Sequence, residues 1–124
     1  MKCYPMLVVR DVPASSAWYQ ELLDTTSGHG GNEFDMITSG HDLLLLLHHG
    51  DHVEHGGLTS PKETPGSGVL IYFSVDDLGP VFERAQAMGA KLIDEPHMNE
   101  KASSVEFSLY DPDGYALTVS QWKG

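Results

Sequence analysis

The chain has 124 residues, seven Lys and Arg against 18 Asp and Glu, and a formal net charge of −11 at pH 7. This length fits one compact domain, and the single cysteine, Cys3, excludes an intrachain disulfide framework. So acidic a chain is not expected to bind nucleic acid, although its charge would mildly attract a cationic small molecule. Its start lacks a signal-peptide pattern, and its longest apolar run, residues 43–47, is too short to span a membrane. A cytoplasmic protein is therefore expected.

An internal repeat organises the sequence. Val9 and Asp11 stand 66 positions before Val75 and Asp77, and each pair is followed by helix-like sequence. Each copy is interpreted as a strand, an Asp-containing turn and an amphipathic helix. The chain is therefore predicted to hold two copies of one module, residues 1–62 and 67–124. Residues 50–67, rich in Gly, Pro, Thr and Ser, are predicted to form the loop between them.

The first helix is expected to follow Pro13. Ser15 or Ser16 is the predicted N-cap, and Trp18 and Leu22, with Ala14, mark its buried face.

The second helix carries clearer signals. Asp76 or Asp77 is the predicted N-cap, Pro80 suits the first turn, and Gly89 is placed to end the helix. Its apolar stripe consists of Val81, Phe82, Ala85 and Met88.

Strand-like sequence follows each helix. The expected strands are residues 34–38 and 43–47 in the first module, and 91–93, 105–110 and 115–121 in the second. Asp-Pro-Asp-Gly at residues 111–114 is a strong hairpin signal. The order in each module is therefore β-α-β-β-β. Gly28, Gly30 and Gly31 are interpreted as turn residues, because they do not join a strand to a helix as a phosphate-binding loop would.

A tandem β-α-β-β-β chain with Val-Asp-Asp-Leu before its second helix and Asp-Pro-Asp-Gly in its last hairpin resembles the vicinal oxygen chelate superfamily. That superfamily includes the glyoxalase I, bleomycin resistance and extradiol dioxygenase families. The resemblance implies an α+β fold over residues 1–124, in which the two modules form a cupped, incomplete barrel of mixed sheet with helices on the convex side. It also implies a homodimer, by analogy with small members that resemble bleomycin resistance proteins.

Metal-dependent members of the superfamily hold a divalent ion with His and acidic side chains. The resemblance places the matching positions at Tyr4, Leu44, Leu70 and Thr118. These residues are not the ligands that such an ion requires. A cup without a metal or other cofactor is therefore expected.

Strand alternation extends the predicted lining of the cup. The lining residues are Tyr4, Met6, Val8, Leu44, Leu46, His48, Leu70, Tyr72, Ser74, Ala116, Thr118, Ser120 and Trp122. The residues predicted to pack beneath the helices are Leu7, Val9, Ile71, Phe73, Val75, Leu117 and Val119. Ligand contacts are assigned to Tyr4, Met6, Leu44, Leu46, His48, Leu70, Tyr72, Thr118 and Trp122. This mixture of apolar, aromatic and polar groups is typical of a small-molecule pocket.

Four of the seven histidines fall within residues 48–55. This stretch is interpreted as a surface loop, with a lid over the cup or a metal site as alternatives. His48 is the histidine that strand parity aims into the cup. His97 and Met98, in the expected loop of residues 96–104, are further lid candidates, and Cys3 is not expected to be reactive.

The sequence therefore predicts a protein that sequesters an apolar or aromatic ligand in a metal-free cup, with the net charge favouring a cationic one. A metal-dependent lyase, isomerase or dioxygenase that recruits His41, His48 or Glu106 is an alternative. A non-catalytic regulatory or interaction module is another. The expected partners are a small molecule and a second copy of the chain, with no nucleic acid and no membrane.

Overall fold

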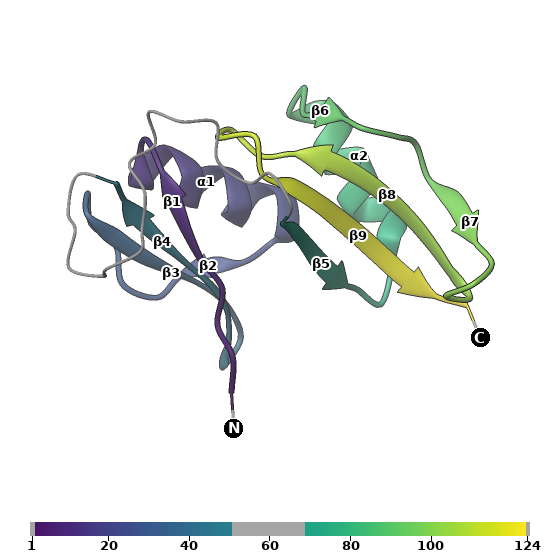
Figure 1. Ribbon diagram of the computed structural model, residues 1–124, viewed down its shortest axis with the longest axis horizontal. Helices are drawn as coiled ribbons and strands as arrows, with labels where there is room; N and C mark the ends of the chain where they lie inside the picture. Colours follow the sequence, from purple (N-terminus) through teal and green to yellow (C-terminus); the bar gives the residue numbers. More distant parts are fainter. Residues whose placement is uncertain (1, 51–68, 124) are drawn as a thin grey trace. The chain divides into compact units, whose positions relative to one another are not determined.

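The computed structural model describes residues 2–50 and 69–123, and the chain divides into two compact units, Met1–Pro65 and Gly66–Gly124. Each unit holds one helix and one mixed sheet (Figure 1). The first unit contains β1 (Met6–Val9), α1 (Val12–Leu23), β2 (Thr26–Ser27), β3 (Phe34–Ser39) and β4 (Asp42–His49). The second contains β5 (Leu70–Ser74), α2 (Leu78–Ala87), β6 (Lys91–Leu92), β7 (His97–Asn99), β8 (Ser104–Tyr110) and β9 (Ala116–Trp122).

The two sheets share one topology, which confirms the α+β class and the repeated β-α-β-β-β order. In each, the first strand pairs in parallel with the last: β1 with β4, and β5 with β9. The last strand then pairs antiparallel with the one before it, and that strand pairs with the remaining outer strands. The second sheet differs in one respect, because its outer strand is split into β6 and β7, both paired with β8.

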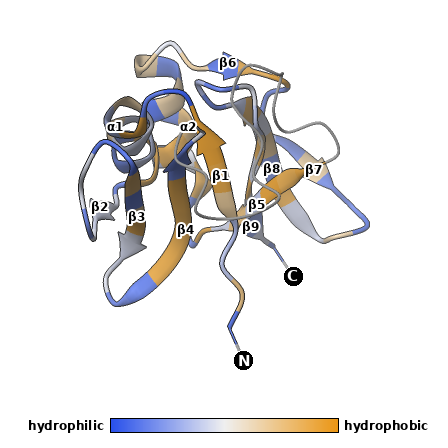
Figure 2. Cartoon of the chain, turned by 60° about the vertical axis from the view of Figure 1, so that its left-hand side comes forward, coloured by the Kyte–Doolittle hydropathy of each residue, from blue (hydrophilic) through white to orange (hydrophobic). Residues whose placement is uncertain are grey.

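The core of the first unit lies between α1 and one face of its sheet. The hydroxyl of Ser16 on α1 bonds to Asp35 on β3, so Asp35 lies on the face of the sheet that the helix covers. Asp35 pairs with Leu47, and Leu47 pairs with Leu7, so both leucines lie on that face too. The fully or almost fully buried side chains of this core are Leu7, Val9, Val12, Tyr19, Leu22, Ile37, Leu45 and Leu47. Figure 2 shows β1 and much of β4 in hydrophobic colours. The predicted helix-facing positions Leu7 and Val9 are confirmed.

The core of the second unit lies between α2 and β8 and β9. The rings of Phe82 on α2 and Phe107 on β8 meet edge to face, with their centroids 5.1 Å apart. Phe107 pairs with Val119, so Val119 lies on the helix side of the sheet, as does Leu117, two residues away. Both are fully buried, as predicted. The other three predicted helix-facing residues, Ile71, Phe73 and Val75, are half-buried.

The ends of α2 follow the sequence signals. The Asp77 carboxylate is the N-cap and accepts a 3.1 Å hydrogen bond from the backbone N–H of Gly79. Gly89 adopts φ +66° immediately after the C-cap residue Met88, a left-handed conformation that favours glycine.

The N-cap predicted for α1 is wrong. The helix begins at Val12, and Asp11 is the cap, accepting a 3.0 Å hydrogen bond from the N–H of Ala14. Pro13 occupies the first turn, where its missing N–H leaves no bond unmade. Ser15 and Ser16 are instead buried within the helix.

The predicted buried face of α1 is shifted as well. Leu22 is fully buried, but Tyr19 rather than Trp18 shares the core with it. Trp18 is half-buried and packs edge to face on Tyr19, with ring centroids 5.0 Å apart, while Ala14 is exposed. The helix starts earlier than expected, so it presents Val12, Ser15, Ser16, Tyr19 and Leu22 to the sheet.

The remaining expectations about segments have mixed outcomes. Residues 51–67 of the predicted linking loop, with His52 and His55, lie outside the described residues. The expected loop of residues 96–104 contains a short strand, β7, because His97–Asn99 pairs with β8. In the described ranges, no helix is both long enough and apolar enough to cross a membrane.

Candidate functional site

The face of the first sheet that points away from α1 is mainly apolar. Met6 pairs with Leu46 and Val8 with His48 across the parallel strands β1 and β4. On β3, Met36 stands opposite Leu46. We refer to this surface, formed by Met6 and Val8 on β1, Met36 on β3, and Leu46 and His48 on β4, as the first open face. It brings together four of the predicted lining residues: Met6, Val8, Leu46 and His48.

His48 is the polar side chain of the first open face that the prediction singled out. It is only 4% exposed, and its Nδ1 donates a 2.8 Å hydrogen bond to the carbonyl oxygen of His49. Because a carbonyl oxygen only accepts, this bond places a ring proton on Nδ1. The Phe34 ring lies edge-on, with its centroid 6.3 Å from that of His48.

Two predicted lining residues of the first unit are placed differently. Tyr4 precedes β1 and is exposed. Leu44 has no paired residue on β3, because a register shift pairs Ile37 with Leu45 and Thr38 with Leu43. It is therefore Leu46, paired with Met6, that corresponds to Thr118, paired with Tyr72, in the second unit. Counting from the turn glycine missed this bulge, which is not visible in the sequence pattern.

The face of the second sheet that points away from α2 is the richer one, and we refer to it as the second open face. It consists of Leu70, Tyr72 and Ser74 on β5, Ala116, Thr118, Ser120 and Trp122 on β9, and Ser104, Glu106, Ser108 and Tyr110 on β8. All the cup residues predicted for this unit lie on it. Three of its apolar or aromatic side chains are largely exposed: Leu70 by 54%, Tyr72 by 51% and Trp122 by 69%.

A hydrogen-bonded network crosses the second open face and centres on Glu106. The Tyr72 hydroxyl donates a 2.8 Å bond to Oε2 of Glu106, spanning from β5 to β8. The Asn99 amide donates to Oε1 at 3.1 Å, and the Ser104 hydroxyl donates to Oε2 at 3.3 Å. Within the described residues Glu106 forms no ion pair with Lys or Arg, so its donors are all neutral.

This network favours the ionised carboxylate. Partial burial acts to raise the pKa of Glu106, but the hydrogen bonds from Tyr72, Asn99 and Ser104 and the charge of His97 outweigh it and lower the pKa below 4.5. His97 pairs with Glu106 across β7 and β8. Met98 pairs with Val105 and so points to the other face of the sheet. The predicted lid residues are therefore strand residues, of which His97 alone shares a face with Glu106.

The buried carboxylate of Asp35, in the first unit, has a different role. Oδ1 accepts from the backbone N–H of Gly30 at 2.6 Å and of Met36 at 2.8 Å, and from the Ser27 hydroxyl at 2.7 Å. The hydroxyl of Ser16 and the backbone N–H of His29 also donate to this carboxylate. Gly30 has φ +78°, a left-handed conformation that glycine adopts readily. The glycine segment thus wraps an internal carboxylate, which supports its interpretation as a turn.

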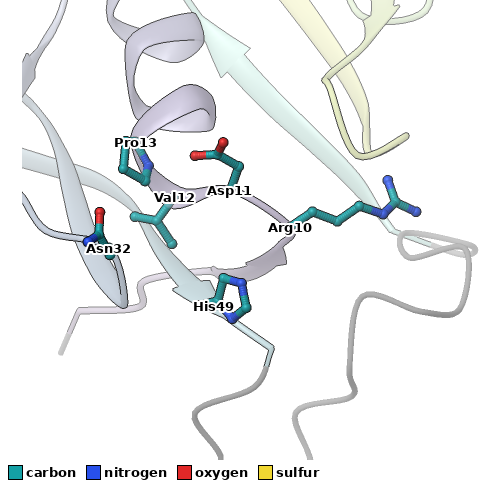
Figure 3. Close-up of a pocket in the computed structure, with 6 residues that line it drawn as sticks. All are labelled: Arg10, Asp11, Val12, Pro13, Asn32 and His49. Carbon is teal, nitrogen blue, oxygen red and sulfur yellow. The ribbon is translucent and has the colours of Figure 1, made fainter.

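A hollow of about 440 Å³ lies where β1 and β4 end and α1 begins, and sequence reasoning did not find it. Figure 3 shows its lining residues: Arg10, Asp11, Val12, Pro13, Asn32 and His49. The Asp11 carboxylate at its edge already caps α1. Arg10 and Asp11 bring opposite charges to one small hollow, so it has no single charge preference. The scattered polar residues that line it share no motif from which it could have been predicted.

The residues at the positions where related metalloproteins bind a metal ion are not suited to bind one in this chain. Leu46 and Leu70 carry no donor atom, and the Thr118 hydroxyl is 2.8 Å from that of Ser108. A divalent ion needs several His, Cys or carboxylate ligands that converge. Among residues 2–50 and 69–123, no three side chains of these types are grouped to hold an ion.

Two units with the same β-α-β-β-β order, each with a parallel pair of first and last strands, define an α+β protein built from a duplicated module. A family model described as the Glyoxalase/Bleomycin resistance protein/Dioxygenase superfamily matches residues 4–119. The chain belongs to this superfamily, as the sequence resemblance implied. A search of curated proteins found no match.

Solved structures agree on the fold. A protein of unknown function from Agrobacterium tumefaciens str. C58 is 26% identical with a TM-score of 0.80, covering 98% of this chain and 94% of the other. A glyoxalase/bleomycin resistance protein/dioxygenase family enzyme from Burkholderia phytofirmans PsJN is 24% identical with a TM-score of 0.78, covering 95% of each chain. TioX from Micromonospora sp. ML1 is 13% identical with a TM-score of 0.72, covering 98% of this chain and 95% of the other.

Proposed function

We propose that this protein binds a planar apolar or aromatic small molecule without a metal ion, and acts by sequestering it. The observation that carries the proposal is the exposure of Leu70, Tyr72 and Trp122 on one sheet face that also presents hydroxyl groups. Exposed aromatic groups beside a few fixed polar ones are the usual lining of a small-molecule site. Exposed apolar side chains gathered on one face are a feature by which binding surfaces are recognised.

The first open face supports the same proposal. Met6 and Leu46 offer an adaptable apolar surface, because methionine fits irregular shapes well. His48 lies on the same face but is buried, and its Nδ1–H is bonded to the carbonyl oxygen of His49, so the apolar side chains carry this support. A ligand held mainly by shape and stacking would suit either face.

The enzymatic alternative finds less support. His41 is exposed near the start of β4, whereas His48 is buried seven residues further along the same chain. At about 3.3 Å of rise per residue, the two imidazoles are too far apart to bind one ion. Glu106, the third of these residues, is a single carboxylate, and in the described ranges no three His, Cys, Asp or Glu side chains are grouped to hold an ion.

We also infer that the protein works in the cytoplasm and associates with a second copy of itself. One cysteine in 124 residues is consistent with a reducing compartment. Light scattering of the purified protein across a concentration series tests the dimer. A mass that stays at 13.6 kDa at every concentration would contradict it.

The first test of the proposed function is the metal content of protein purified without a His tag, measured by mass spectrometry. The expected result is less than a tenth of an equivalent of any divalent transition metal. A stoichiometric ion would overturn the metal-free proposal.

The second test is a thermal-shift and calorimetric screen against planar aromatic compounds, neutral and charged. A compound present at a hundredfold excess over its Kd stabilises the folded state by about 2.7 kcal/mol, which such a screen detects. Binding should be weakened at least tenfold in Tyr72→Ala and in Trp122→Ala. Met98→Ala is the matched control, because Met98 is equally exposed but points to the other face of the same sheet. Equal binding by all three variants would contradict the proposed site.

A further inference from the structure

We infer that the second open face is specific for an organic cation, and that Glu106 is the residue that recognises its charge. This inference rests on the proposed binding function and adds the chemical class of the ligand. It commits to a small planar cation, such as an aromatic ring that carries a positively charged nitrogen.

The geometry of Glu106 carries the first step. Its carboxylate is held by three bonds, from Tyr72 at 2.8 Å, Asn99 at 3.1 Å and Ser104 at 3.3 Å. A carboxylate offers about four lone-pair sites on its two oxygens. Oε2 accepts two of these bonds and Oε1 accepts one, so Oε1 retains an accepting position. The side chain is thus fixed in place by its neighbours and still able to accept a charged donor.

Charge carries the second step. The three donors are neutral, so they orient the carboxylate without cancelling its negative charge. His97, across the β7 and β8 pair, is the titratable residue that faces it from its neighbouring strand. A carboxylate that keeps its charge in a partly desolvated position attracts a cation more strongly than one in bulk water.

The surrounding rings carry the third step. Trp122 pairs with Ser104, two positions along β8 and β9 from the row of Glu106 and Ser120, so the two rows are neighbours on one face. The Tyr72 ring approaches the same carboxylate from β5, since its hydroxyl bonds to it. Tyrosine and tryptophan rings attract cations over their faces and stack on planar groups. A carboxylate with these two exposed aromatic side chains on the same sheet face is complementary to a planar cation.

The test is isothermal titration of the full chain with N-methylquinolinium, which carries a permanent positive charge, and with neutral quinoline, which has nearly the same shape. The wild-type protein should bind the cation at least tenfold more tightly than quinoline. Glu106→Gln should weaken N-methylquinolinium binding at least tenfold and change quinoline binding less than twofold. Tyr72→Phe keeps the ring but removes a bond to Glu106, and should weaken binding of the cation severalfold while sparing quinoline.

Glu83→Gln is the matched control, because it removes the same charge from α2, on the other side of the sheet. It should leave both affinities within twofold of wild type. Circular dichroism and thermal melts establish that each variant is folded. Equal affinity of the wild type for the two probes, or an equal loss in Glu83→Gln and Glu106→Gln, would overturn the cation specificity alone. Absence of binding of either probe at millimolar concentration would overturn the proposed function with it.

Discussion

The Ser16 hydroxyl of α1 donates a 2.5 Å hydrogen bond to Oδ2 of Asp35 on β3, and both side chains are buried between helix and sheet. The same carboxylate accepts hydrogen bonds from Ser27 and from the N–H groups of Gly30 and Met36. One acidic side chain therefore ties together the helix, the strand and the turn that precedes the strand.

Replacing Asp35 by alanine should destabilise the protein by about 3 kcal/mol. The substitution removes several charge-assisted hydrogen bonds and leaves buried donors without acceptors. Chemical denaturation followed by circular dichroism measures the change. Asp42→Ala, which removes an exposed aspartate at the start of β4, should change stability by no more than about 0.5 kcal/mol. Similar losses in the two variants would contradict the role given to Asp35.

Stability should also depend on pH through Asp35. Burial acts to raise its pKa, but hydrogen bonds from Ser16, Gly30, Ser27 and Met36 hold the pKa below the ordinary value of 3.8. A carboxyl whose pKa is lowered by folding binds its proton more weakly in the folded state. Its stabilising effect is complete above pH 3.8 and is lost as the pH falls through the folded pKa.

Denaturation midpoints of wild type and Asp35→Asn between about pH 6 and pH 2.5 test this dependence. The difference in stability between wild type and Asp35→Asn should be constant at the upper end of this pH range and should shrink below pH 3.8. An advantage that stays constant over the whole range would show that Asp35 titrates alike in the folded and unfolded chains.

The caps of the two helices give a third prediction. Asp11→Ala and Asp77→Ala should each lower stability by about 1 kcal/mol, because each removes the acceptor for an N–H in the first turn. Asparagine retains an acceptor at both positions, so Asp11→Asn should lower the stability much less than Asp11→Ala. Thermal melts measure the series. Equal losses in the alanine and asparagine variants would point to charge rather than capping.

A fourth prediction contrasts two large side chains of the second unit. Phe107 is fully buried against Phe82, so Phe107→Ala should cost about 3–5 kcal/mol through lost burial and a residual cavity. Trp122 is larger but mostly exposed, so Trp122→Ala should cost less than about 1 kcal/mol while it impairs ligand binding. Urea denaturation separates the two outcomes. A large stability loss in Trp122→Ala would mean that this ring is structural.

The repeat made most of the fold predictable. Val9 and Asp11, with Val75 and Asp77, identified the module, and strand alternation then separated Leu117 and Val119 from Thr118 and Ser120. Both inferences depend on local periodicity, which a single sequence displays.

The missed features depend on contacts between distant residues. Glu106 was named only as a metal ligand to be recruited, because nothing near it in the sequence indicates that Tyr72, 34 positions earlier, bonds to its carboxylate. The local sequence predicts Ser15 or Ser16 as the cap of α1, because nothing near them indicates that Ser16 bonds to Asp35, 19 positions away. The bulge at Leu44 depends on how two strands pair, which the pattern of five consecutive leucines does not reveal.

The parallel pairing of first and last strands affects the order in which the chain can fold as it is synthesised. β9 lies between β5 and β8, so β5 has no neighbour in its sheet until the ribosome has released residues 116–122. In the first sheet, β1 gains its neighbour as soon as β4, which ends at His49, has emerged from the ribosome. Nascent chains should therefore acquire the first sheet while the second is still being translated, and β5, with its apolar Leu70 and Tyr72, would wait unpaired during that interval.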